Sequence, residues 1–319
     1  MNADNAGTMQ AVRFDDYGST CVLEVRNVPI PSCGPSQVRV AVAYAGINPG
    51  EIIIREGHPM ARKMFPARFP DEGQGSDFTG VVTELGQSVT QWSVGQLVIG
   101  MSDERSSQAE FVTIDESRLV ALPEGLDPKV AGCLYVSGTT ACAIVNAVGV
   151  SEKDTVVISA AAGGVGILAS QLARRAGARV IGIASPSSAE VLSGLGVEPL
   201  AYGDDLVERI RAVAPDGVDA FLDCFGNGYV DAAVSLGVPQ HRINTIIDYE
   251  AAQRHGTLMV GMAAIKDPAA VVAKLAELIA RQELVFPIRA VYPMTEVRAA
   301  YDDLAGRHGV GKIVLAVNP

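Results

Sequence analysis

The sequence predicts an α/β protein in which a β-rich domain precedes a doubly wound parallel sheet of six strands. Three observations predict this class. Short apolar runs separated by Gly, Ser and Asp fill residues 9–126, apolar strands alternate with helical segments from about 127 to 262, and a glycine-rich turn lies early in the second region. The first pattern is typical of a small barrel or sandwich, and the second of parallel sheets that helices cover on both faces.

Length, composition and charge restrict the classes of function. A chain of 319 residues suggests about two domains, and its 48% hydrophobic residues allow a large buried core. The net charge of −11 argues against nucleic-acid partners, which require a clustered basic surface. The N-terminus has no apolar signal core, no apolar run reaches the roughly 18 residues of a membrane span, and the number of cysteines is odd. We therefore expect a cytoplasmic protein without membrane segments or a disulfide framework.

The first region contains several short predicted strands. Residues 37–47 alternate in polarity, which places Val38, Val40, Val42 and Tyr44 on one face of a strand. Further apolar runs bounded by turn-forming residues follow at 78–86, 95–101 and 109–115.

The second region alternates strands with helices. The predicted strands are 154–160, 178–185, 197–203, 218–224, 242–248 and 256–262. A last helix at 267–284 leads to another strand, 309–317, which can return to the first domain. The predicted domains are therefore 1–126, completed by 267–319, and 127–266.

The glycine-rich turn almost spells the dinucleotide-binding fingerprint G-x-G-x-x-G, with Ala161, Gly163 and Gly166 in the three glycine places. The alanine keeps the turn tight, the first glycine lets backbone approach a pyrophosphate, and the last lets the helix pack closely on the strand. The helix N-terminus then offers free N–H groups to phosphate. Because the turn follows a strand and opens a helix, we expect Gly163, Gly164, Val165 and Gly166 to bind a dinucleotide.

The end of the second strand of the series indicates which dinucleotide binds. NAD sites usually carry an acid about 20 residues after the glycines, whereas this chain has Ser185 there and no acid before Glu190. Hydroxyls can donate to a 2′-phosphate that a carboxylate would repel. We therefore expect NADPH as cofactor, with Ser185 and Ser188 at its 2′-phosphate. Tyr202, which ends the third strand, either flanks the adenosine or is a half-buried strand residue.

Further cofactor contacts are expected where later strands end, because parallel sheets bind ligands beyond the carboxyl ends of their strands. Phe225 and Gly226 follow the fourth strand of the series. Asp248, and the pair Gly261 and Met262, end the fifth and sixth.

Segments throughout the chain resemble the medium-chain dehydrogenase/reductase superfamily, and specifically its zinc-independent quinone oxidoreductase branch. This resemblance implies a GroES-like barrel domain, completed by the C-terminal segment, beside a Rossmann domain with the cofactor between them. It also implies a homodimer, which the exposed edge of strand 256–262 could form by pairing two subunits. The segments are "AGINPGEIIIREG" (45–57), "GSDFTGVVTELG" (75–86), "SGTTACAIV" (137–145), the run from 159 to 185, "DCFG" (223–226) and "GVGKIVLAV" (309–317).

The resemblance allows the zinc question to be tested. Zinc alcohol dehydrogenases of this superfamily carry a Cys where this chain has Ile47-Asn48, and a His-Glu pair where it has Ser76-Asp77. Their structural zinc lobe would fall near 100–110, which contains no cysteine, and the four histidines are scattered. We therefore expect no metal. Hydride would pass from NADPH to a small-molecule quinone or α,β-unsaturated carbonyl, whose electrons delocalise onto oxygen.

The resemblance also suggests residues for the catalytic cleft. Asn48 looks like a residue that contacts the nicotinamide ribose or a substrate oxygen, or else a residue of an Asn-Pro turn. Thr140 looks like the family's threonine near the nicotinamide, or else a helix-start hydroxyl. His58 could donate a proton or be a surface-loop residue, and Tyr44 is a catalytic candidate that the strand pattern places in the core.

Two alternative functions remain open. The first is an enoyl reductase that acts on an acyl thioester or polyketide-like intermediate. Related enoyl thioester reductases use a tyrosine where this chain has Pro59, which argues against that mechanism. The second is an NADPH-binding protein without rapid catalysis.

Overall fold

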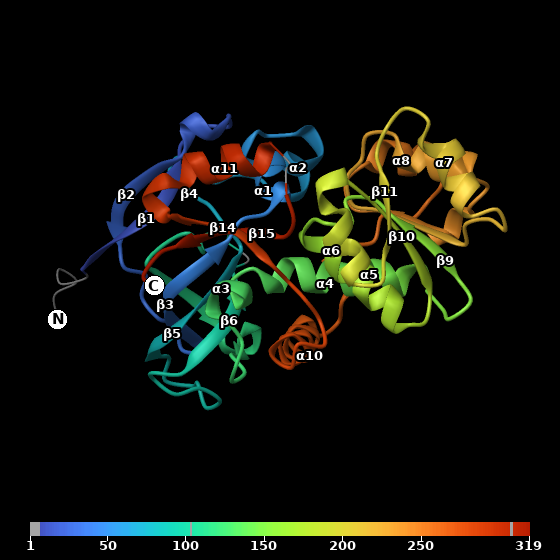
Figure 1. The fold of residues 1–319 in the computed structure, drawn as a ribbon. Coiled ribbons are helices and arrows are strands. Elements are labelled where there is room, and N and C mark those ends of the chain that lie inside the picture. Colours follow the sequence, from blue (N-terminus) through green and yellow to red (C-terminus); the bar gives the residue numbers. More distant parts are fainter. Residues whose placement is uncertain (1–6, 103, 307–308) are drawn as a thin grey trace.

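The computed structural model describes residues 7–102, 104–306 and 309–319. They form a barrel domain and a domain built on a parallel sheet, which lie side by side (Figure 1). The α/β class and this two-part architecture confirm the fold class that the sequence predicts, whereas the domain boundaries stay predictions. No helix in the described ranges is long and apolar enough to cross a membrane. The cytoplasmic location also stays a prediction.

The barrel domain is built from two sheets. The larger has the order β14-β15-β3-β5-β6-β8, with β7 paired to β3, and the smaller has the order β2-β1-β4. Alternate residues of β3 are fully buried, as the sequence pattern predicts for Val38, Val40 and Val42. The strands are β1 Thr8–Phe14, β2 Glu24–Pro29, β3 Gln37–Gly46, β4 Glu72–Gly73, β5 Asp77–Leu85, β6 Leu97–Met101, β7 Phe111–Asp115, β8 Val120–Ala121, β14 Ile288–Pro293 and β15 Lys312–Ala316.

The C-terminal strand lies inside this larger sheet. β15 pairs antiparallel with β3, so that Val314 lies opposite Gly46 and Ala316 opposite Tyr44. The barrel therefore combines strands from both ends of the chain. Its helices are α1 Pro49–Arg55, α2 Pro59–Met64, α3 Pro128–Ala131 and α11 Val297–Ala305.

The second domain is a parallel sheet with the order β11-β10-β9-β12-β13. The strand order reverses between β9 and β12, which is where doubly wound sheets bind ligands. One face packs on α4, α5 and α10, and the other on α7, α8 and α9. The elements are β9 Thr155–Ile158, β10 Arg179–Ala184, β11 Glu198–Ala201, β12 Ala220–Asp223, β13 Ile243–Thr245, α4 Leu134–Ala147, α5 Gly164–Arg175, α6 Ala189–Gly194, α7 Leu206–Val213, α8 Tyr229–Ser235, α9 Tyr249–His255 and α10 Pro268–Ala280.

The sixth strand predicted at 256–262 does not form, and the described sheet has five strands. Only a single bridge joins Leu258 to Asn244. Beyond this bridge, the Asn244 side chain replaces the backbone hydrogen bonds of a strand pair. Its Oδ1 accepts from Val260 N at 2.8 Å, and its Nδ2 donates to Val260 O at 3.0 Å. A buried asparagine therefore ends the sheet by occupying the backbone groups that another paired residue would have used.

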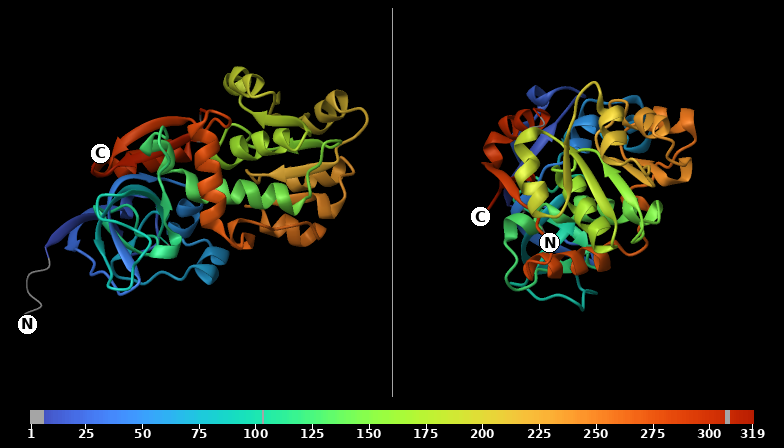
Figure 2. Two further views of the ribbon diagram at one scale, coloured as in Figure 1. Left: turned by 90° about the horizontal axis from the view of Figure 1, so that it is seen from below. Right: turned by 45° about the vertical axis from the view of Figure 1, so that its right-hand side comes forward.

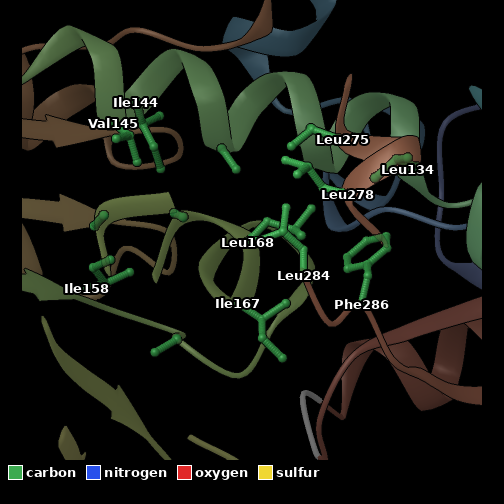
Figure 3. Packing of buried hydrophobic residues seen from close by; sticks show 14 of the residues in the cluster. Leu134, Ile144, Val145, Ile158, Ile167, Leu168, Leu275, Leu278, Leu284 and Phe286 are labelled. Carbon is green, nitrogen blue, oxygen red and sulfur yellow. The ribbon is translucent and has the colours of Figure 1, made fainter. Parts of the chain in front are cut away.

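A continuous apolar cluster joins the two domains. Leu134 and Ile144 on α4 pack with Ile167 and Leu168 on α5 and with Leu275 on α10 (Figure 3). The same cluster includes barrel residues such as Ile99 and Val120, so α4 and α10 are shared between the domains. Figure 2 places α10 between the barrel and the parallel sheet. This common core fixes the barrel against the glycine-rich turn.

Candidate active site

The glycine-rich turn has the strand-turn-helix geometry that the fingerprint requires. β9 ends at Ile158, and α5 begins at Gly164 with Gly163 as its N-cap. Ala161 is fully buried and donates its N–H to Ile183 O at 3.0 Å. A Cβ on Gly166 would lie 2.1 Å from Ala160 O, so only glycine fits there. The turn therefore brings α5 close to the sheet with its N-terminal N–H groups at the switch point.

The C-terminal strand of the barrel touches this turn directly. Gly311 donates its N–H to Ala162 O at 2.9 Å. A Cβ on Gly164 would lie 2.6 Å from Lys312 Cδ and 3.0 Å from Ser137 Oγ. The aliphatic stem of Lys312 therefore runs over the turn, and the lack of a side chain at 164 makes room for it.

Asn48 lies at the centre of a buried polar network where the domains meet. Its Nδ2 donates to Asp77 Oδ2 at 2.8 Å and to Glu51 Oε1 at 3.2 Å. Its Oδ1 accepts from Lys312 Nζ at 2.6 Å. Both amide hydrogens and the amide oxygen are thus engaged within the protein. The contact with ribose or substrate that the sequence predicts stays a prediction, and it would have to share or displace one of these bonds.

Glu51 receives four donors from different parts of the barrel. The backbone N–H groups of Asn48 and Ser76 donate to it at 3.0 and 3.1 Å, and Tyr301 Oη donates at 2.5 Å. The Asn48 side chain is the fourth donor. Gln74 and Gln108 in turn donate to Tyr301 Oη at 2.9 and 2.7 Å. Burial raises the pKa of the Glu51 carboxyl, and burial together with the Glu51 charge raises that of the Tyr301 hydroxyl.

Asp77 and Lys312 form the part of the network nearest the second domain. Asp77 Oδ1 accepts from Val136 N of α4 at 2.7 Å, and Lys312 Nζ donates to Ile47 O at 2.7 Å. Burial raises the pKa of Asp77, although the Lys312 charge and the Asn48 bond oppose that shift. The Arg55 guanidinium, only 1% exposed, lies 5.0 Å from the Tyr301 ring centre. Two buried cations thus accompany two buried carboxylates.

This network occupies the positions at which the zinc branch of the resembled superfamily has its ligands. There the amide of Asn48 bonds both the carboxylate of Asp77 and the ammonium group of Lys312. Among the residues that the structure describes, no group of three or more His, Cys, Asp or Glu side chains could hold a metal ion. The expectation that the protein uses no zinc stays a prediction.

The residues predicted for the adenosine end form a hydroxyl cluster. Ser185 Oγ lies 2.9 Å from both Ser187 Oγ and Ser188 Oγ. Tyr202 follows β11, the neighbour of β10, and is 57% exposed rather than half-buried. A Cβ on Gly203 would lie 3.0 Å from Arg209 Nη2. The structure therefore places the Arg209 guanidinium of α7 at Gly203, the residue after Tyr202, although the serine loop itself has no cation.

The residues predicted at later strand ends lie in loops at the same edge of the sheet. The N–H groups of Phe225 and Gly226 both donate to Asp223 Oδ1, at 3.0 and 2.9 Å. Asp248 caps α9 by accepting from Ala251 N at 3.0 Å. Gly261 and Met262 lie after the single bridge, where a short 3₁₀ helix begins.

Among the described residues, the remaining candidates make no side-chain hydrogen bond to the Asn48 network. Thr140 is buried in the middle of α4 rather than at a helix start. His58 is exposed as the residue before α2. Tyr44 lies on β3, with Lys129 Nζ 6.0 Å from its ring centre. No hydrogen bond given for the described residues joins His58 or Tyr44 to Asn48, and their catalytic roles stay predictions.

Sequence reasoning missed Lys312, Glu51 and Tyr301. A lone lysine beside the apolar run "IVLAV" was a usable signal, because a charge at the start of a buried strand needs a partner. Glu51 stands three residues after Asn48, the spacing of a helix capping box. Tyr301 carried no such signal, since its partners are distant in sequence.

Two family models match the chain. Residues 34–148 match the alcohol dehydrogenase GroES-like domain, and residues 195–315 match the zinc-binding dehydrogenase family. The chain belongs to the medium-chain dehydrogenase/reductase superfamily. It is an oxidoreductase of this superfamily. Membership of a dehydrogenase family implies that its cofactor is a nicotinamide dinucleotide.

Individual relatives show which members of the superfamily this chain resembles. A quinone oxidoreductase of Pseudomonas aeruginosa is 27% identical, over 95% of this chain and 98% of its own. The solved structure of the quinone oxidoreductase from Coxiella burnetii has a TM-score of 0.85 at 28% identity, covering 98% of this chain and all of its own. The Streptomyces orinoci spectinabilin polyketide synthase protein NorB is 30% identical over 89% of this chain, which spans 13% of that protein. The oxidoreductase thus resembles quinone oxidoreductases over its full length and a segment of a polyketide synthase.

The raised pKa of Asp77 gives a testable pH dependence. The folded state holds this proton more tightly than the unfolded chain, so the contribution of Asp77 to wild-type stability falls as pH rises from about 4, the ordinary aspartate value, through the raised pKa. Asp77→Asn lacks this loss. Urea unfolding between pH 4 and 9 should therefore show the variant gaining stability relative to wild type as pH rises.

The weakened bonds to Val136 and Asn48 add a constant destabilisation, so the trend with pH is the diagnostic quantity. Asp204→Asn, which removes an exposed carboxylate, is the matched control. A difference between Asp77→Asn and wild type that stayed flat, or that fell as pH rose, would contradict the raised pKa.

Proposed function

We propose that this oxidoreductase reduces a quinone or a conjugated enone by hydride transfer from NADPH. The observation that carries the proposal is the position of Lys312. Its stem crosses the dinucleotide turn at Gly164, and its ammonium group is held by Asn48 and Ile47. The third N–H of the Lys312 ammonium group would thereby be a donor beside the place where a nicotinamide meets its acceptor. Quinones and enones delocalise the incoming electrons onto an oxygen that such a donor can stabilise.

The chain's residues fit a dinucleotide. Gly164 and Gly166 lie where a Cβ would collide with Lys312 or with Ala160 O, which leaves backbone N–H groups free to approach phosphate. A bound nicotinamide cofactor would supply the hydride. The turn would hold the pyrophosphate, Thr140 would lie near the nicotinamide, and the apolar walls of the domain junction would exclude water from the reacting atoms. After hydride transfer, water would supply the final proton as the product leaves the domain junction.

The preference for NADP rests on the adenosine end of the site. Three serine hydroxyls converge at the end of β10, and Arg209 reaches Gly203, which follows the neighbouring strand β11. Hydroxyls and a guanidinium group are suitable donors to a 2′-phosphate. Arg209 also forms an ion pair with Asp205 at 2.9 Å, so Asp205 partly neutralises the charge that would face the 2′-phosphate. These features favour NADPH over NADH.

A panel of acceptors tests the reaction. NADPH oxidation, followed by absorbance with quinones, small enones and enoyl thioesters, should be rapid with the first two classes. A chelator should leave the rate unchanged, because no step requires a metal. Turnover confined to enoyl thioesters would replace this function with that of an enoyl reductase, which the likeness to a polyketide synthase segment favours. Tight NADPH binding without turnover on any acceptor would indicate a cofactor-binding protein.

Substitution of Ser185 tests the cofactor preference. Ser185→Asp places a carboxylate where the 2′-phosphate would lie, so the ratio of kcat/KM for NADPH to that for NADH should fall about tenfold or more. Ser193→Asp, an exposed change on α6, is the control and should leave the ratio unchanged. An unchanged ratio in Ser185→Asp would place the 2′-phosphate elsewhere.

A homodimer is proposed at the edge of the parallel sheet. Residues 257–261 lie beyond β13, and Met259 is 43% exposed there. The Asn244 side chain bonds the inner side of this segment, which leaves its other side for a second copy. Sedimentation at micromolar concentration should give a dimer, and Met259→Lys should shift it toward monomer. A monomeric wild-type protein would exclude this interface.

A further inference from the structure

Asp223 is a buried carboxylate that the proposed reaction has not yet used. It is the last residue of β12, it is 0% exposed, and it lies between the ends of β9 and β13. Its register partner on β13 is Thr245, and Ser159 follows β9 on its other side. The carboxylate thus lies at the switch point of the sheet.

The hydrogen bonds around Asp223 are all donated to its carboxylate. Ser159 Oγ accepts from Cys224 N at 2.8 Å, so its own hydrogen goes to Asp223 Oδ1 at 2.7 Å. Thr245 Oγ1 accepts from the N–H groups of Ile247 and Asp248, so its hydrogen goes to Asp223 Oδ2 at 2.8 Å. With the amides of residues 225 and 226, both oxygens only accept, which is the pattern of an ionised carboxylate.

The four groups that donate to Asp223 are all uncharged. They are two hydroxyls and two backbone amides, so none of them neutralises the carboxylate. Asp77 and Glu51 are in a different situation, because the buried cations Lys312 and Arg55 accompany them in one network. The negative charge of Asp223 therefore acts on its surroundings with little internal compensation.

The charge of Asp223 affects the pKa of two neighbouring groups. Burial, and next to it the charge of Asp223, raises the pKa of the Cys224 thiol and of the Tyr229 hydroxyl. A field that disfavours a thiolate and a phenolate at this edge of the sheet favours a cation there by the same interaction.

In the proposed binding mode, the nicotinamide half of the cofactor would lie on this side. The serine cluster at the end of β10 is the proposed adenosine end, and the pyrophosphate would lie on the turn after β9. The other half must then extend past β12, on the side of Asp223, toward the Asn48 network. This step rests on the proposed function.

We propose that Asp223 sets the redox equilibrium of the bound cofactor in favour of hydride donation. When a hydride leaves C4 with both electrons of its bond, the nicotinamide ring changes from neutral to cationic, and the acceptor gains the hydride and then a proton from water. A buried anion near the ring stabilises the cationic form more than the neutral form. It thereby favours transfer toward the quinone or enone.

Binding measurements on both redox forms test the proposal. Dissociation constants for NADP⁺ and NADPH are measured by the fluorescence of bound NADPH and by competition, in wild type and in Asp223→Asn. Removal of the charge should raise the ratio of the NADP⁺ constant to the NADPH constant about tenfold, as a charge within about 10 Å of the ring would require. That change corresponds to a bound cofactor about 30 mV more positive.

Two matched variants separate charge from structure. Ser159→Ala and Thr245→Val each remove one donor to Asp223 and keep its charge, so they should weaken both redox forms alike and leave the ratio unchanged. Asp223→Ser, which also removes the charge, should shift the ratio as Asp223→Asn does, and it provides the test should the asparagine variant fail to fold.

The outcomes distinguish this proposal from the one on which it rests. An unchanged ratio in the charge-removing variants, or an equal shift in the two charge-keeping variants, would overturn the role of Asp223 and leave the proposed reaction intact. Failure of wild type to bind either redox form would overturn the proposed reaction, and this role with it.

Discussion

The need to balance charge inside the domain junction governs much of this structure. Asp77, Glu51, Lys312 and Arg55 are all buried, and Asn48 bonds three of them. They come from α1, β5 and β15, and Tyr301 of α11 closes the network on the far side. Removal of one member of a buried ion pair typically costs about 3–5 kcal/mol, because its partner is left without compensation. These buried charges therefore hold α1, β5 and β15 in one arrangement within the barrel.

The same residues connect the two domains. Gly311 bonds the turn through its backbone, and Lys312 crosses it with its side chain before it reaches Asn48. The geometry of the glycine-rich turn and that of the Asn48 network are thus fixed against each other without a ligand. Preorganised donors of this kind need no rearrangement when charge develops during a reaction.

The sequence predicted those features that local patterns encode. The turn at 161–166 and the alternation of strands and helices follow from neighbouring residues, and both were correct. The prediction of a strand at 256–262 was wrong, because the Asn244 side chain bonds backbone groups that would have paired in a regular strand. Lys312 was missed because its partner Asn48 is 264 residues away. The partners of Asp223 lie on β13 and in the segments that follow β9 and β12, so the pattern of β12 alone could not reveal them.

The return of the C-terminal strand to the barrel has a consequence for biosynthesis. Domains generally fold as units while the chain emerges from the ribosome, N-terminal parts first. Here the parallel sheet can be complete before β15 exists, whereas β3 must wait for its neighbour. Until residue 312 has been made, Asp77 and Glu51 lack the cation they share. The domain that begins first is finished after the parallel sheet, and its hydrophilic centre can close only once residue 312 has been translated.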